Sequence, residues 1–284
     1  MLSWNCRGLG PTRNVQFLKE LVAQERPKVI FLCETLCNKE KLELLCRSLE
    51  YEGCFVVEAN GRSEGLALFW KNEEEVNVDS FFTNHIDSLV QFEGYGKFRF
   101  TGLYGEPNRS LRRNTWKLLW TLYARSKEVW CIMGDFNNVL HNSEKIGGNP
   151  YPTWLIEGFK EVTQQCGLID LEMNGHPFTW EKSRDTPQWI EAKLDRTMVN
   201  HDWLIKFPDA KLFNTEVSPS DHSPLFLDME HQVAVERVRH FRFENCWVRF
   251  QECEAIIQDS WSNGLLMHQN QLCGQALQDW GTHV

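Results

Sequence analysis

The stretch Val129-Trp130-Cys131-Ile132-Met133-Gly134-Asp135-Phe136-Asn137 decides the fold. Its first five residues are all apolar and predict a strand that is buried on both faces, as strands are when helices cover a sheet. A glycine, an acid and an amide follow where this strand ends. Ligands bind at strand ends in α/β sheets, because loops converge there on a rigid support. The stretch therefore predicts an α/β protein with a polar site at the end of the strand.

Helices and strands alternate on both sides of this stretch. Helical spacing of apolar residues predicts helices over Val15–Val22, Lys39–Leu49, Leu111–Lys127 and Thr153–Cys166. Further strands are predicted over Val29–Cys33, Cys54–Glu58, Leu66–Trp70, Val76–Phe82, Ser88–Phe92, Phe98–Tyr104, Phe178–Glu181, Ala192–Val199, Leu212–Val217 and Leu225–Met229. Several adjacent strands among alternating helices indicate sheets that are covered by helices.

The pattern changes near residue 231. Strand candidates stop there, and apolar residues recur on or near one helical face at Phe241, Phe243, Trp247, Phe250, Ile257 and Trp261. This predicts a domain over residues 1–230 and a helical extension over residues 231–284. We expect the protein to be a monomer.

Composition excludes several classes of protein. The 284 residues carry 30 Lys and Arg against 39 Asp and Glu, for a net charge of −9. With 42% hydrophobic and 24% charged residues, the chain is neither disordered nor fibrous. No apolar run approaches the ~20 residues that span a bilayer, and Met1–Trp4 lacks the basic start of a secretory signal, so we expect an intracellular protein without membrane contact.

The ten cysteines form no C-x-x-C pair, which predicts reduced thiols and no zinc site. The acidic net charge, taken alone, argues against binding nucleic acid through bulk charge.

Small polar and acidic residues interrupt the apolar runs at six predicted strand ends. They are Asn5, Glu34, Tyr104, Gly134-Asp135-Phe136-Asn137, Asp195 and Ser220-Asp221-His222-Ser223-Pro224. Each alone is more typical of a turn, a cap or a solvated charge. Together they predict an oxygen-rich pocket with one imidazole, which suits Mg²⁺ and the hydrolysis of a phosphoester.

These residues occur in the order of a known family. Trp4-Asn5-Cys6-Arg7-Gly8, Glu34-Thr35, Tyr104-Gly105-Glu106-Pro107, Gly134-Asp135-Phe136-Asn137, Phe178-Thr179-Trp180, Leu194-Asp195-Arg196 and Ser220-Asp221-His222-Ser223-Pro224 resemble the motifs of the endonuclease/exonuclease/phosphatase superfamily. The similarity is greatest to the apurinic-endonuclease-like domain of plant non-LTR (LINE-type) retroelement polyproteins. Phe241-Arg242-Phe243-Glu244-Asn245-Cys246-Trp247 resembles the linker to their reverse transcriptase. The resemblance implies a four-layered α/β sandwich, two packed sheets flanked by helices, with a reverse transcriptase fused or lost.

The resemblance also implies a role for each site residue. Glu34, Asn5 and Asp221 would hold Mg²⁺, with Mn²⁺ as an alternative. Asp135 would orient or deprotonate the attacking water, Asn137 and Tyr104 would bind phosphate, and His222, held by Asp195, would contact the scissile phosphate. Cleavage would leave a 3′-hydroxyl. We expect the protein to act in the nucleus if its substrate is chromosomal DNA.

Three positions depart from the family pattern. Arg7 stands where repair enzymes carry an acid, and Asn108 lies one residue beyond the usual phosphate-binding asparagine. Ala192 replaces an aromatic residue that lines the abasic pocket, which puts abasic-site activity in doubt.

A basic segment follows Tyr104, in which Glu106 is the only acid up to Lys127. We predict that Asn108, Arg109, Arg112 and Arg113 contact the DNA backbone; the alternative is a solvated helix face. Because Mg²⁺ would offset part of the acidic charge, DNA binding should be modest, metal-dependent and lost as salt rises. Two other functions stay open: a phosphatase or phosphodiesterase acting on lipid or inositol phosphates, and a catalytically silent retroelement relic.

Overall fold

The computed structural model describes residues 1–58, 65–215, 218–229 and 251–261, together with 273, 276, 277 and 280. The chain divides into two compact units, Met1–His231 and Gln232–Val284. The site lies in the first unit.

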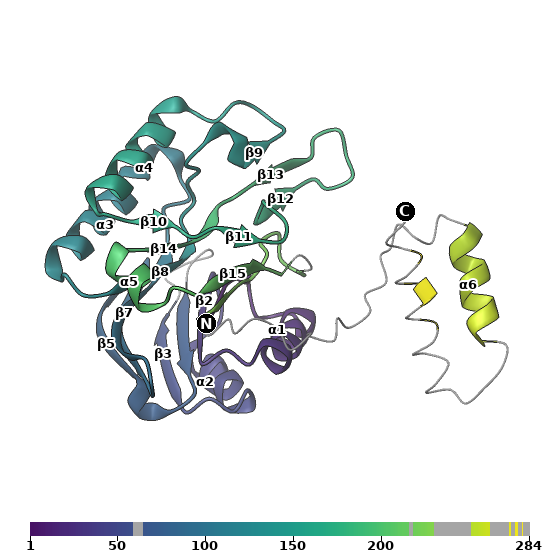
Figure 1. The fold of residues 1–284 in the computed structure, drawn as a ribbon, viewed down its shortest axis with the longest axis horizontal. Helices are drawn as coiled ribbons and strands as arrows, with labels where there is room; N and C mark the ends of the chain where they lie inside the picture. Colours follow the sequence, from purple (N-terminus) through teal and green to yellow (C-terminus); the bar gives the residue numbers. More distant parts are fainter. Residues whose placement is uncertain are drawn as a thin grey trace. The chain divides into compact units, whose positions relative to one another are not determined.

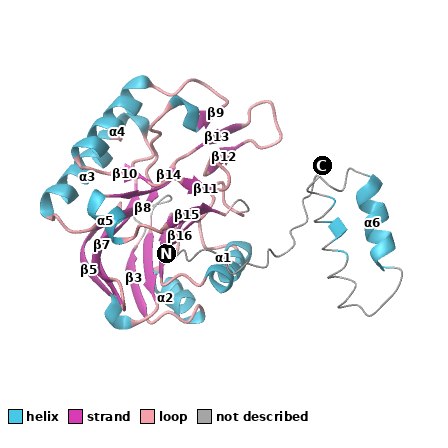
Figure 2. Cartoon of the chain, in the orientation of Figure 1, coloured by secondary structure: helices cyan, strands magenta, loops and turns pink. Residues whose placement is uncertain are grey.

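Two packed sheets form the centre of the first unit (Figures 1 and 2). The seven-stranded sheet has the order β11 (Met173–Asn174), β15 (Lys211–Asn214), β16 (Leu225–Asp228), β1 (Leu2–Asn5), β2 (Val29–Cys33), β4 (Leu66–Trp70) and β3 (Gly53–Val57). The six-stranded sheet has the order β10 (Ile169–Asp170), β14 (Asp195–Val199), β8 (Trp130–Asp135), β7 (Gly96–Tyr104), β6 (His85–Phe92) and β5 (Val76–Phe82).

A third, three-stranded sheet consists of β12 (Trp180–Lys182), β13 (Ile190–Ala192) and β9 (Lys145–Ile146).

The helices cover the outer faces of the two large sheets. Helices α1 (Thr12–Glu25) and α2 (Lys39–Ser48) lie on one side, and α3 (Arg113–Arg125) and α4 (Thr153–Gln165) lie on the other (Figure 1). The short helix α5 (His201–Lys206) follows β14, and α6 (Gln251–Trp261) belongs to the second unit. The predicted four-layered α/β sandwich is therefore confirmed.

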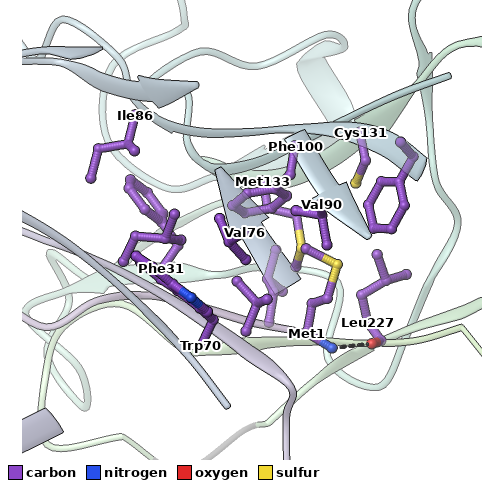
Figure 3. Close-up of a cluster of buried hydrophobic side chains, with 14 of the residues drawn as sticks. Met1, Phe31, Trp70, Val76, Ile86, Val90, Phe100, Cys131, Met133 and Leu227 are labelled. Atoms are coloured by element: carbon purple, nitrogen blue, oxygen red, sulfur yellow. Dashed lines mark hydrogen bonds between the residues drawn. The ribbon is translucent and has the colours of Figure 1, made fainter. Parts of the chain in front are cut away.

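Alternation along the central strands explains why they read as uninterrupted apolar runs. In β2, Val29 and Phe31 point into the core between the sheets, while Ile30 and Leu32 pack beneath the helices on the other face. Both faces of the strand are thus buried away from solvent. Figure 3 shows the core between the sheets, where Phe31 and Trp70 meet side chains such as Phe100 and Met133 from the opposite sheet.

Several predicted boundaries differ from the structure. The strand predicted over Ala192–Val199 is wrong: the chain leaves β13 at Ala192 and enters β14 at Asp195, in a different sheet. The helix predicted over Leu111–Lys127 begins at Arg113, after a 3₁₀ turn at Arg109–Leu111.

The strand predicted over Leu212–Val217 ends at Asn214, and its last two residues lie outside the described residues. The short elements β9, β10, β11 and α5 were not predicted.

In the second unit, α6 includes Ile257 and Trp261, and Cys253, Cys273 and Leu277 form a small buried cluster. The predicted helical positions Phe241, Phe243, Trp247 and Phe250 lie outside the described residues. Across the described segments, no helix has the length and apolar character needed to cross a membrane, and nine cysteines are free thiols.

Candidate active site

Strand ends of both large sheets supply the candidate site. Asn5 ends β1 and pairs in register with Cys33, directly before Glu34. In the other sheet, Asp135 ends β8 between Tyr104 of β7 and Asp195 of β14, which are both its register partners. The two sheets therefore bring residues from opposite ends of the sequence to one place.

A buried histidine lies between two buried carboxylates. Nδ1 of His222 is 2.8 Å from Oδ2 of Asp195, and its Nε2 is 3.8 Å from Oδ2 of Asp135. All three side chains are almost fully buried. The side chain of Thr179 holds the backbone at Asp195: its Oγ1 accepts hydrogen bonds from the amides of Leu194 and Asp195, at 3.0 and 2.9 Å.

Burial and charge shift the ionisation of this group. Burial alone would lower the pKa of His222, but the carboxylates of Asp195 and Asp135 raise it to about 9. Burial raises the pKa of Asp135 to about 6, against the opposing effect of His222. Near neutral pH the site thus holds a protonated imidazole beside a carboxylate that can accept a proton.

Asn5 joins the histidine group to Glu34. Its Nδ2 donates to Glu34 Oε1 at 2.9 Å and to Asp135 Oδ2 at 3.0 Å. Its Oδ1, the atom that a metal ion would take, accepts from the amide of Arg7 at 3.3 Å. In this arrangement Asn5 is a bridge between two carboxylates, and its role as a metal ligand stays a prediction.

The hydroxyl of Tyr104 also donates to Glu34 Oε1, at 3.0 Å. Burial and the charges of Glu34 and Asp135 raise the pKa of Tyr104, so that it remains a donor. Asn137 is turned toward Asp135: its Nδ2 donates to Asp135 Oδ2 at 3.0 Å and to the carbonyl of Gly105 at 2.9 Å. Both hydrogens of this amide hold the site together in the described arrangement.

The donor chemistry of Glu34 and Asp221 fits a hard divalent cation, since both offer carboxylate oxygens at the edge of the site. Arg7 stands between them. Its guanidinium lies 2.7 Å from Asp221 Oδ2 and 3.6 Å from Glu34 Oε2. Asp221 Oδ2 also accepts from Trp180 Nε1 at 3.0 Å. Two of the three predicted metal ligands thus share the guanidinium of Arg7.

The backbone at the site is strained. Arg7, Glu34 and Asn137 have positive φ angles of 44°, 51° and 52°, a region that residues other than glycine seldom adopt. Such angles persist where surrounding structure imposes them, and they cluster at functional sites. All three residues border the same cavity.

This cavity has a volume of 330 Å³. Its lining comprises Arg7, Glu34, Tyr104, Pro107, Arg109, Arg112, Asp135, Asn137, Lys145, Tyr151, Trp180, Ala192, Leu194 and His222. Polar residues from the two sheets occupy one part of the wall, while basic, aromatic and small apolar residues complete it.

Two of the four predicted DNA contacts line the cavity. These two are Arg109 and Arg112. Arg113 lies over the ring of Trp154, 5.8 Å from its centre. The side chain of Asn108 caps the following turn, where it accepts a hydrogen bond from the amide of Ser110. Tyr151 and Lys145 also line the cavity and were not predicted as site residues. Neither has a local signal, because Tyr151 contacts Arg112 across 39 residues of sequence.

A two-sheet α/β sandwich with a buried histidine–aspartate pair and further carboxylates at one end defines the class of phosphoester hydrolases. The chain belongs to the endonuclease/exonuclease/phosphatase family, whose model matches residues 2–222.

Solved structures share the fold. A 3′ phosphatase from Neisseria bound to a product DNA hairpin has a TM-score of 0.61 and 17% identity, over 80% of this chain and 97% of the other. An AP endonuclease from Archaeoglobus fulgidus has a TM-score of 0.61 and 14% identity, over 81% and 98%. The endonuclease domain of TRAS1, a telomere-specific non-LTR retrotransposon, has a TM-score of 0.58 and 13% identity, over 81% and 98%. No curated protein matches the sequence.

Proposed function

We propose that the protein is a divalent-metal-dependent endonuclease that nicks DNA and leaves a 3′-hydroxyl. The observation that carries this proposal is the buried His222–Asp195 pair beside Asp135, at a cavity that also has basic residues in its wall. The structural neighbours named for nuclease and DNA-end activities support it, as does the motif resemblance to retroelement endonucleases. On the same grounds we propose a non-LTR retroelement as the origin of the chain.

In the proposed reaction, each site residue has a separate role. Asp135, with its raised pKa, positions a water molecule and accepts its proton as the water oxygen bonds to phosphorus. The bond from phosphorus to the 3′-oxygen breaks, and this oxygen takes up a proton from solvent to become the 3′-hydroxyl. Protonated His222 donates a hydrogen bond to a phosphate oxygen as negative charge develops there, and Asp195 holds the ring in place. A Mg²⁺ or Mn²⁺ ion held by Glu34 and Asp221 would neutralise phosphate oxygens.

Nicking of supercoiled plasmid tests the proposal. Wild type should convert supercoiled DNA to open circles in Mg²⁺, and EDTA, His222→Ala or Asp135→Ala should abolish this conversion. His176→Ala is the matched control, because His176 pairs with Glu191 at the protein surface. The nicked product should incorporate labelled nucleotides with a DNA polymerase without prior phosphatase treatment, as a 3′-hydroxyl requires.

A phosphatase acting on inositol phosphates is the second candidate, favoured by the modest cavity volume and its basic wall residues. If folded wild-type protein leaves plasmid intact but releases phosphate from an inositol phosphate, this candidate replaces the first. Inertness toward both substrates indicates a silent relic.

A further inference from the structure

Two arginines lie over one buried tyrosine in the cavity wall, and a lysine lines the same cavity. The guanidinium carbons of Arg109 and Arg112 lie 5.4 and 5.6 Å from the centre of the Tyr151 ring. Lys145 lines the same cavity, and its Nζ donates to the carbonyl oxygens of Gly147 and of Asn149, the latter at 2.9 Å. Arg109, Arg112 and Lys145 are called the basic cluster below.

The basic cluster is not neutralised from within the protein. Across residues 1–58, 65–215 and 218–229, no carboxylate lies within ion-pairing distance of any of its three members. Their charges act on one another: burial and the charge of Arg109 lower the pKa of Lys145. Burial and Arg109 also lower the pKa of Arg112, against the smaller opposing effects of Tyr151, Asp135 and Glu106. Repelling cations at one wall of a cavity favour the entry of an anion.

The burial of Arg112 increases the tendency of the basic cluster to bind an anion. Arg112 is only 5% exposed, and its Nε is a buried donor that has no hydrogen-bond partner among the residues the structure describes. The rest of the guanidinium donates to Tyr151 Oη and to the carbonyl of Pro107, which are both neutral acceptors. A buried cation without a direct ion pair is unfavourable in the free protein, because the carboxylates of Asp135 and Glu106 compensate its burial only in part. An anion in the cavity would offset the remaining cost.

The basic cluster adjoins the candidate catalytic group. Tyr151, which accepts from Arg112, donates to the carbonyl oxygen of Asn137 at 3.4 Å. Asn137 in turn donates to Asp135. An anion at the basic cluster therefore occupies the same cavity as a phosphate at His222, with Tyr151 and Asn137 between the two positions.

We propose that the basic cluster is a second phosphate site, which holds a phosphate group of the substrate other than the one that is cleaved. The planar forks of the two arginines suit phosphate oxygens, and Lys145 adds a point charge. This inference rests on the proposed function, because it places both phosphates on one substrate. The second phosphate comes from a neighbouring phosphodiester of a nucleic acid or from a polyphosphorylated small molecule.

Salt dependence of DNA binding provides the test. The affinity of the full chain for a fluorescent DNA duplex is measured by anisotropy in Mg²⁺ at several salt concentrations, with Arg109→Gln, Lys145→Gln or neither added to His222→Ala, which prevents cleavage of the duplex. Each lost phosphate contact should reduce the slope of log affinity against log salt by about 0.9. Arg109 is exposed and Lys145 half-buried, so neither substitution opens the core.

Lys19→Gln is the control for net charge, since Lys19 is exposed on α1 and does not line the cavity. A second arm measures the binding of inositol hexakisphosphate to the same proteins by calorimetry. Reduced slopes in the two cluster variants alone support the site and identify nucleic acid as the source of the phosphate. Weaker inositol hexakisphosphate binding with unchanged slopes supports the site and identifies a small polyphosphate.

The proposal is overturned if the cluster variants match Lys19→Gln in both arms. Plasmid nicking by wild type is measured in parallel. Nicking without any effect of the cluster variants rejects the second phosphate site and leaves the endonuclease proposal intact. If wild type neither binds nor nicks DNA but binds inositol hexakisphosphate, and the cluster variants lose that binding, the second phosphate site is supported and the endonuclease proposal is rejected.

Discussion

His222 and Asp195 form a buried pair with an Nδ1–Oδ2 distance of 2.8 Å, and the surface pair of His176 and Glu191 has the same length. The side chain of His222 is 4% exposed, and that of His176 is 44% exposed. Charges interact more strongly where water is excluded. The two pairs therefore differ in environment more than in geometry, and each serves as the control for the other.

Replacing Asp195 tests whether the pair is functional. Asp195→Asn should reduce DNA nicking by roughly 10²- to 10⁴-fold, because the imidazole loses the carboxylate that orients it and stabilises its protonated form. The pKa of His222 should fall, as followed by NMR titration of its ring protons. Glu191→Gln should leave both unchanged, and equal losses in the two variants would contradict a special role for Asp195.

Stability should depend on pH through His222. Its folded-state pKa of about 9 exceeds the ordinary value of 6.5, so protonation stabilises the fold fully below pH 6.5, and this stabilisation is lost as the pH rises to 9. Each pKa unit corresponds to about 1.4 kcal/mol, giving a loss of up to about 3 kcal/mol. Urea unfolding in EDTA should show this loss for wild type. His222→Asn should lack it, and parallel curves would show that His222 is not its source.

Arg7 should compete with a divalent cation for Glu34 and Asp221. Its side chain is 50% exposed, and exposed ion pairs contribute at most about 1 kcal/mol. We therefore expect Arg7→Gln to bind Mn²⁺ up to about fivefold more tightly in calorimetry, independently of catalysis. Arg13→Gln is matched in charge, since Arg13 donates only to the carbonyl of Pro219 nearby. Equal affinities of the two variants would exclude competition by Arg7.

Gly134 places Asp135 by a backbone conformation that side chains disfavour. Its φ is +149°, and an added Cβ would lie 1.9 Å from the carbonyl oxygen of Leu103 on the neighbouring strand. Gly134→Ala should lower the free energy of unfolding by about 2 kcal/mol or more. Gly10→Ala, where an added Cβ has no neighbour within 4 Å, should change it by less than about 0.5 kcal/mol. Chemical denaturation of wild type and both variants measures these free energies of unfolding, and equal losses in the two variants would contradict a special role for Gly134.

The strands that line the main core were predictable because both of their faces are apolar. Val29–Cys33 and Leu66–Trp70 match the observed strands at every residue. The break between Ala192 and Asp195 was not predictable: the two strands adjoin in sequence, and only their partners separate them. Ala192 pairs with Trp180 and Lys145, whereas Asp195 pairs with Asp135.

The polar residues at strand ends were also foreseeable, because parallel neighbours such as β7 and β8 end at the same edge of a sheet. Their mutual orientation was not. Nothing local in the sequence shows that the Asn5 amide turns its nitrogen toward Glu34, or that Arg7 reaches Asp221 across 214 residues. Arg112 is predicted to contact the DNA backbone, with a solvated helix face as the alternative; its burial against the distant ring of Tyr151 has no local signal.

Strand β1 lies between β2 and β16, so Leu2 pairs with both Ile30 and Phe226. The first and the last strand of the first unit are thus neighbours in one sheet, and His222 precedes the last strand. A growing polypeptide on the ribosome would carry Glu34 and Asp135 long before it could place the histidine beside them. Hydrolytic activity would therefore emerge only when synthesis of the first unit is nearly finished, and a chain stopped earlier would have the acids without the imidazole.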